Sequence, residues 1–225
     1  MATELRRDRR EKQKRQRQRH QHQRHRSGRG IPNQLVMGGV IGGAILLALV
    51  GLRWAGALEP PAAPLDLNAA EYQVPAGATI GTLQPDQGRQ HINSPQRGSY
   101  TSLPPTSGDH WSSVSPAAPA PWGIKDSTLD NEVTVHNLEH GGIVIVYKNL
   151  TPAETDQLKG IARSLMNVQY RKIILEPYPA LTDAKVAVTA WRWLLKLQSV
   201  DQTQIVQFVR AHYSDPNYAP EPNVP

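Results

Sequence analysis

The sequence contains no cysteine. Without thiols, the chain can form neither disulfide bonds nor the cysteine-ligated zinc sites that many small domains use. A chain without thiols is also indifferent to an oxidising compartment, so this composition suits a domain outside the cytoplasm.

The part of the chain that can fold has no excess of basic residues. The formal net charge is +6, but 12 of the 25 Lys and Arg residues lie within residues 1–30, beside three acidic residues. The rest of the chain therefore has 13 basic and 16 acidic residues. Phosphate recognition needs a basic face on folded structure, so we expect no nucleic-acid partner for the folded domain.

A G-x-S-x-G nucleophile elbow is absent as well. A triad of Ser107 or Ser99 with a histidine and Asp109 could be recognised only by its geometry. Serine-nucleophile chemistry is therefore not the reaction that we expect from this chain.

The first 57 residues have the pattern of a membrane anchor. Residues 1–30 have no apolar face, and we expect them to form a disordered basic leader in the cytoplasm. Residues 35–57 begin with 18 uncharged residues (35–52), which nearly cross a hydrocarbon core of about 30 Å. Because the basic flank precedes this segment, we expect a single-pass protein of the cell membrane. Membrane lipid would surround residues 35–57, and the C-terminal domain would be extracytoplasmic.

Two alternatives concern the same membrane segment. Residues 55–57 (AGA) resemble a small-residue cleavage site, so cleavage after Ala57 would make the segment a removable signal peptide. Four glycines at small-xxx-small spacing could also pack two membrane helices into a homodimer. These glycines are Gly38, Gly39, Gly42 and Gly43.

After the anchor, we expect a Pro/Ala linker over 58–70, a folded domain over 71–215 and a Pro-rich tail over 216–225. Hydrophobic patterns within the domain predict strands near 132–136, 142–148, 171–176 and 185–192. A helix over 151–166 is indicated by a Thr151 N-cap and Glu154 three residues later, and a second helix follows Asp201. The expected fold is α+β, with a small, mainly antiparallel sheet and helices on one face.

The candidate site lies in the stretch EVTVHNLEHGGIVIVY, residues 132–147. Two β-prone runs flank a polar hinge there, which would hold His136, Glu139 and His140 at the rim of the sheet. The segment HNLEH also fits the H-x-x-E-H pattern of the inverted zinc peptidases. That motif requires a helix, and strand-type residues surround it here, so we do not expect a peptidase of this class.

A metal could also draw on two histidines from the preceding loops, His91 and His110. Four histidines without cysteine suit zinc, copper or nickel better than a hard cation. We therefore predict a transition-metal site, with zinc or copper as the cofactor. Glu139 would act there as a candidate base or as a second-shell acceptor. The ligand candidates are His91, His110, His136 and His140.

Two sequence blocks resemble a known family. PPTSGDHW (104–111) is followed by VHNLEHGGIVIVY (135–147), with His91 upstream and an APEP-type tail downstream. This combination resembles the bacterial, membrane-anchored family known as domain of unknown function 3105, over roughly residues 72–222. The resemblance implies a basic leader, one membrane span and an exported domain, and it supplies no reaction.

Three functions are compatible with these patterns. The first is a metal-dependent binding or handling module that uses the four histidines. The second is a non-enzymatic structural or interaction domain, whose tryptophans meet a protein partner at the cell surface. The third is a metal-assisted hydrolase, which would need an open coordination position on the metal.

Overall fold

The computed structural model describes residues 65–114 and 118–225. The expected leader (1–30), membrane segment (35–57) and most of the expected linker lie outside these residues. Within the described ranges, no helix combines the length and the hydrophobicity that a membrane span needs. The elements, in chain order, are η1 (Ala70–Tyr72), β1 (Thr82–Leu83), β2 (His91–Ile92), β3 (His110–Trp111), β4 (Gly123–Ile124), α3 (Asn131–Glu139), β5 (Ile143–Tyr147), α4 (Pro152–Val168), β6 (Ile173–Pro177), β7 (Val186–Ala190), β8 (Trp193–Leu197) and α5 (Gln202–His212).

A six-stranded sheet forms the centre of the domain, in the order β1-β8-β7-β5-β6-β4. The pairs β5–β7, β7–β8 and β1–β8 are antiparallel, whereas β6 runs parallel to β5 and to β4. Along β5, Val144 lies opposite Ile174 on one side and Thr189 on the other. The α+β class and the mainly antiparallel sheet are thus confirmed.

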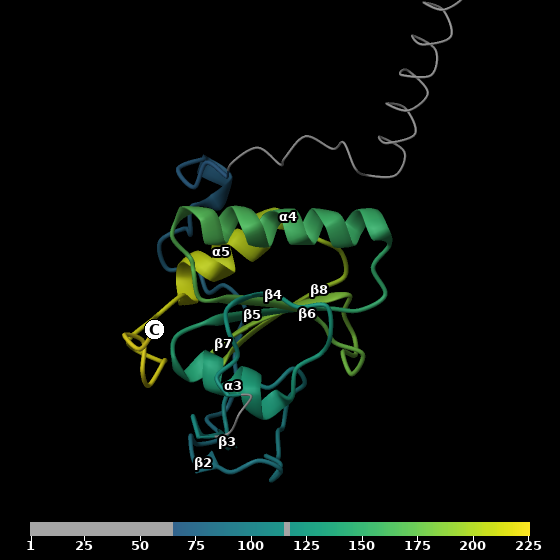
Figure 1. The fold of residues 1–225 in the computed structure, drawn as a ribbon. Helices are drawn as coiled ribbons and strands as arrows, with labels where there is room; N and C mark the ends of the chain where they lie inside the picture. The colour runs from purple at the N-terminus through teal and green to yellow at the C-terminus, as the bar shows by residue number, and fades with distance from the viewer. Residues whose placement is uncertain (1–64, 115–117) are drawn as a thin grey trace, which may run out of the picture. The chain divides into compact units, whose positions relative to one another are not determined.

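Helices cover both faces of this sheet, so the expectation of helices on one face was wrong (Figure 1). Ile143 and Ile145 of β5 point into a core shared with α4 and α5. Val144 and Val146 point to the other face and pack in a core shared with α3. A strand buried on both faces reads as a continuous apolar run, which is why β5 has no polar alternation.

The helix α3 replaces the strand that we expected near 132–136. Alternating Val133 and Val135 suggested a strand, but both are buried and pack against the sheet as part of a helix. β-branched residues cost a helix only about 0.5 kcal/mol each relative to alanine. Burying one such side chain contributes about 1.5–3 kcal/mol, so packing outweighs propensity here.

Two glycines end α3 rather than preventing it. Gly141 adopts a φ of 79°, the left-handed conformation that favours glycine after a helix. The amide of Gly142 donates to the Asn137 carbonyl (3.1 Å) and that of Gly141 to the Leu138 carbonyl (2.9 Å). This pair of hydrogen bonds is a Schellman motif, which satisfies the last carbonyls of the helix.

The other predicted elements are confirmed with small shifts of their ends. Helix α4 begins with the expected capping box between Thr151 and Glu154, and α5 is capped by Asp201. The strands expected near 142–148 and 171–176 are β5 and β6. The last expected strand is the first half of a hairpin, in which β7 turns into β8 at Arg192, whose φ is 65°.

The chain's C-terminal residues 216–225 form no helix or strand, but they are bound to the domain. The amide of Glu221 donates to the Glu139 carbonyl at 2.9 Å. The Lys172 ammonium donates to the carbonyls of His140 (3.0 Å) and Pro222 (2.9 Å). The tail therefore lies against the end of α3, close to the candidate site. The domain boundaries 71 and 215 stay predictions.

Candidate metal centre

A short parallel strand pair brings two histidines together from separate loops. In the β2–β3 pair, His91 lies directly opposite His110, and Ile92 opposite Trp111. The pair is held by backbone hydrogen bonds, such as that from the His110 amide to the Gln90 carbonyl (3.0 Å). The ring centroids of the two histidines are 4.6 Å apart.

Helix α3 supplies the third histidine and a carboxylate. Residues three apart on a helix share one face, so His136 and Glu139 point together toward β3, which lies beside α3 in Figure 1. The His136 ring centroid is 5.2 Å from that of His110 and 5.3 Å from that of His91. Three imidazoles from three parts of the chain thus meet beside one carboxylate.

These three histidines form a group that could hold a metal ion. One ring nitrogen of each lies within 4.8 Å of one ring nitrogen of the others. A point about 2.8 Å from all three nitrogens therefore exists, compared with a zinc–nitrogen distance of about 2.0–2.1 Å. Small side-chain movements would complete the coordination.

Backbone carbonyls hold the two buried rings in one orientation. Nδ1 of His110 donates to the Gly108 carbonyl (2.8 Å), and Nδ1 of His136 donates to the Trp111 carbonyl (2.5 Å). The Nε2 atom of His136 is then left with a lone pair for a metal, whereas Nε2 of His110 faces the Glu139 carboxylate. Metal-binding histidines in proteins are usually held in this way by a second hydrogen bond.

Glu139 is a buried carboxylate in contact with two of the rings. Its Oε2 lies 2.9 Å from His110 Nε2 and 3.3 Å from His91 Nε2. Burial by itself would raise the pKa of Glu139, but the hydrogen bond from His110 and the charges of the nearby imidazoles outweigh it, so the pKa is lowered. Burial also lowers the pKa of His136. An ionised carboxylate and a neutral imidazole are the states that bind a metal.

The fourth histidine candidate faces elsewhere. The His140 ring lies 4.8 Å from the His136 ring, but its Nε2 faces Glu221 (3.6 Å) and its Nδ1 the Pro225 carbonyl (3.3 Å). The structure therefore brings His91, rather than His140, together with His110 and His136.

Part of the reason for setting the peptidase pattern aside was wrong, because residues 136–139 lie at the end of α3 and not in a strand, with His140 as the C-cap. The geometry nevertheless differs from what that pattern requires. Two ligands spaced four apart would be His136 and His140, and the structure turns His140 toward the C-terminal tail.

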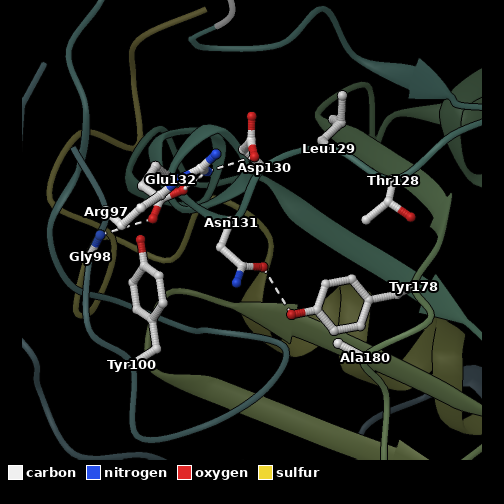
Figure 2. Close-up of a pocket in the computed structure, with 10 residues that line it drawn as sticks. All are labelled: Arg97, Gly98, Tyr100, Thr128, Leu129, Asp130, Asn131, Glu132, Tyr178 and Ala180. Atoms are coloured by element: carbon white, nitrogen blue, oxygen red, sulfur yellow. Dashed lines mark hydrogen bonds and ion pairs between the residues drawn. The ribbon is translucent and has the colours of Figure 1, made fainter. Parts of the chain in front are cut away.

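Sequence reasoning missed a polar network that ties the histidine loop to α3. The Arg97 guanidinium contacts Asp130 (2.6 Å) and Glu132 (2.9 Å), and the Gly98 amide donates to the other Glu132 oxygen (2.8 Å). Figure 2 shows these residues at the rim of a pocket of about 370 Å³, with Tyr178 on its far side. An acidic residue in the first turn of α3 was the available signal, and it is visible only once the segment is known to be helical.

Three tryptophans in the described part of the chain lie in the core. Trp111, Trp191 and Trp193 are all buried. The Trp191 ring stands edge-on to His110, with centroids 6.2 Å apart. The structure thus places Trp191 and Trp193 inside the domain.

No curated protein and no solved structure matches the chain significantly. One family profile does match, over residues 91–225, which is more than half of the chain and contains every residue of the histidine cluster and both of the sequence blocks quoted above. The chain belongs to this family, which is described as protein of unknown function (DUF3105).

Proposed function

We propose that this chain is a metal-binding protein whose domain holds one divalent transition-metal ion with His91, His110, His136 and Glu139. The observation that carries the proposal is the fixed orientation of the two buried rings. Their Nδ1 atoms donate to carbonyls, and a ring nitrogen of each lies within 4.8 Å of a ring nitrogen of His91, beside a buried carboxylate.

A metal ion resolves the hydrogen bonding of His110, whose side chain is fully buried. Both of its ring nitrogens face oxygen atoms, the Gly108 carbonyl and the Glu139 carboxylate. A neutral imidazole has only one N–H, so donation to both oxygens requires the imidazolium, whose Nε2 proton a metal ion can replace. A divalent cation between the Nε2 atom and the carboxylate satisfies both groups and offsets the buried negative charge.

The ligand chemistry favours zinc or copper(II). Three imidazoles and a carboxylate suit zinc, copper(II) and nickel, whereas a hard cation prefers a set made only of oxygen atoms. Copper(I) prefers sulfur ligands, and the chain has no cysteine. Zinc and copper(II) are therefore the ions to test first.

Glu139 supports binding rather than hydrolysis. A metal-assisted hydrolase needs an open coordination position and a base that is free to take a proton from water. Here the carboxylate contacts the imidazole nitrogens directly, which is the place of a fourth ligand. The interaction-domain alternative loses support because three of its tryptophans are buried.

The proposal also includes the cellular location that the sequence predicts for this protein. Residues 35–57 would anchor the protein in a bacterial cell membrane by contact with lipid, with the metal-binding domain on the outer side. Homodimerisation through the glycine face of that segment and contact with a cell-surface protein are further expectations of the same scheme. Protease protection of the C-terminal domain in sealed vesicles tests this topology.

The metal proposal is tested by calorimetric titration of the untagged full chain in detergent, after chelator treatment, with zinc and with copper(II). We expect one tight equivalent, and we expect the double variant His110→Ala, His136→Ala to lose it. His140→Ala is the matched control on the same helix and should retain it. A wild-type chain without a tight equivalent would overturn the proposal, and far-UV circular dichroism of the variants identifies loss by unfolding.

A further inference from the structure

We propose that His91 is the exchangeable ligand of this centre, and that the metal passes to an acceptor with an imidazole or thiolate donor that displaces His91. This inference rests on the proposed function, because it describes how the same site exchanges its metal. It adds an activity, namely direct metal transfer, and the chemical class of the partner.

Exposure separates His91 from the other three groups. The side chain of His91 is 45% exposed, whereas those of His110 and Glu139 are 0% and 2% exposed, and His136 is 3% exposed. The three buried side chains thus form the floor of the metal site, and His91 forms the side that faces solvent. An incoming ligand can reach the metal from the side of His91.

The hydrogen bonds of the rings also distinguish His91 from the two buried histidines. The rings of His110 and His136 are each held at Nδ1 by a backbone carbonyl. Among the described residues, the one polar partner of the His91 ring is Glu139, which would itself be a metal ligand. Once its bond to the metal breaks, no backbone hydrogen bond in the described part of the chain orients the His91 ring, which keeps only its ring contacts with His110 and His136.

The exchange step is balanced without any oxidant or reductant. A donor nitrogen or sulfur of the acceptor forms a bond to the metal as the bond from His91 breaks, and the metal keeps its charge and its number of ligands. A neutral imidazole donor leaves the proton count unchanged, and a thiolate donor brings one negative charge. Transfer is complete when further acceptor donors replace Glu139 and the two buried histidines.

This route avoids release of a free ion from the buried floor. Dissociation without a partner would break all four ligand bonds to the ion before any new bond forms, which is costly. An acceptor that binds before the metal leaves removes this cost from the rate-limiting step. The rate of transfer should therefore depend on the acceptor concentration.

The test uses the full chain loaded with zinc and mixed with the chromophoric chelator 4-(2-pyridylazo)resorcinol, whose pyridine and azo nitrogens stand for the acceptor. Stopped-flow absorbance should give a transfer rate that rises in proportion to chelator concentration. His140→Ala is the control and should follow the wild-type line. A rate that does not change with chelator concentration overturns the inference.

A second measurement identifies the displaced ligand. Free imidazole should restore zinc affinity to His91→Ala, because the vacated position opens to solvent. The added imidazole should raise the zinc affinity of this variant by about tenfold or more, within the range by which single outer-shell groups alter metal affinity. The same imidazole should not rescue His110→Ala, whose side chain is fully buried.

Rescue of both variants, or of neither, overturns the role of His91 while the metal site stands. A wild-type chain that takes up no zinc overturns both this inference and the proposed function. The two failures are therefore distinguished by the binding titration alone. Melting temperatures of the metal-free variants show whether each one is folded.

Discussion

At the scale of single residues, the carboxylate of Glu139 decides the character of the site. It is almost fully buried and lies 2.9 Å from His110 Nε2 and 3.3 Å from His91 Nε2. A buried carboxylate stays ionised only where cations or donors compensate it. The imidazoles lower its pKa here, which prepares it to bind a metal.

Replacing this charge should weaken metal binding without altering the shape of the site. We predict that Glu139→Gln lowers zinc affinity by about tenfold to a hundredfold or more, because the amide keeps the size but not the charge. Glu221→Gln is the matched control, since this exposed carboxylate pairs with His140 and lies outside the ligand set. Calorimetric titration of both variants measures the difference, and equal affinities would contradict a ligand role for Glu139.

A second residue-scale prediction concerns Glu176, which is buried in β6. Its Oε2 accepts a hydrogen bond from the Leu129 amide at 2.6 Å. Burial raises the pKa of Glu176 to about 7, although the Leu129 amide and Lys125 act in the opposite direction. The folded protein therefore binds a proton at the Glu176 carboxyl more tightly than the unfolded chain does.

This raised pKa makes the domain less stable as pH increases. The contribution of Glu176 is fully present below about pH 4.5 and is lost as pH rises through about 7, at a cost of roughly 3 kcal/mol. Glu176→Gln, which can still accept from Leu129, should therefore lose less unfolding free energy than wild type between pH 5 and pH 8. Urea unfolding at both pH values measures this, and an unchanged difference would contradict the assignment.

At the scale of elements, the sequence predicts best where one local signal agrees with one packing pattern. The capping box at Thr151 and the cap at Asp201 predicted α4 and α5, and the continuous apolar run predicted β5. Helix α3 was missed because its β-branched residues match a strand period. The local signals that favoured the helix were only Asp130 before it and Gly141 after it.

The three histidines of the cluster were among the four ligand candidates, but their geometry was not predicted. Nothing local tells that His91 pairs with His110, because two-residue strands have no period and their register depends on contacts from elsewhere in the fold. Nor does spacing tell whether Glu139 or His140 joins His136, since both share a helical face with it. The tail that draws His140 away lies more than 80 residues later in the chain.

The end of α3 gives an element-scale prediction. A Cβ at Gly141 would lie 2.9 Å from Ser214 Cα, in addition to the strain of its positive φ. Gly77→Ala is the matched control, because its φ is also positive and nothing lies within 4 Å. We predict that Gly141→Ala lowers the unfolding free energy by about 1–2 kcal/mol more than Gly77→Ala does. Equal losses in urea unfolding would mean that Ser214 does not pack against this turn.

At the scale of the whole molecule, the metal would join three distant segments into one unit. The loop that carries His91, the loop that carries His110 and helix α3 come together at this cluster, and the β2–β3 pair and the Arg97 network connect them further. A ligand that binds only the folded state stabilises it by mass action. Metal binding should therefore be visible in global stability as well as in local affinity.

We predict that zinc at a hundred times its dissociation constant adds about 2.7 kcal/mol to the unfolding free energy. The melting temperature of the full chain should rise accordingly with zinc concentration. The double variant His110→Ala, His136→Ala should show no such rise, although it keeps the three histidines of the leader. Scanning calorimetry at several zinc concentrations measures both, and an equal rise in the variant would assign the effect to another site.

The C-terminal tail is a second contributor to the whole molecule. Deleting residues 216–225 removes the buried Ala219 and the Pro222 carbonyl that accepts from Lys172, so we predict a loss of about 1–3 kcal/mol of stability. Zinc affinity should stay close to that of the full chain, because no ligand is removed. If a folded deletion variant lost metal binding, His140 and the tail would have to belong to the metal site.

The central claim is that three imidazoles and one carboxylate surround a single metal ion, and X-ray absorption of the zinc-loaded full chain measures that environment directly. The account predicts a shell of nitrogen and oxygen atoms at about 2.0–2.1 Å, with ring scattering from three imidazoles. This signal should disappear in the His110→Ala, His136→Ala variant. A shell with fewer than three imidazoles, or an unchanged spectrum in the variant, would contradict it.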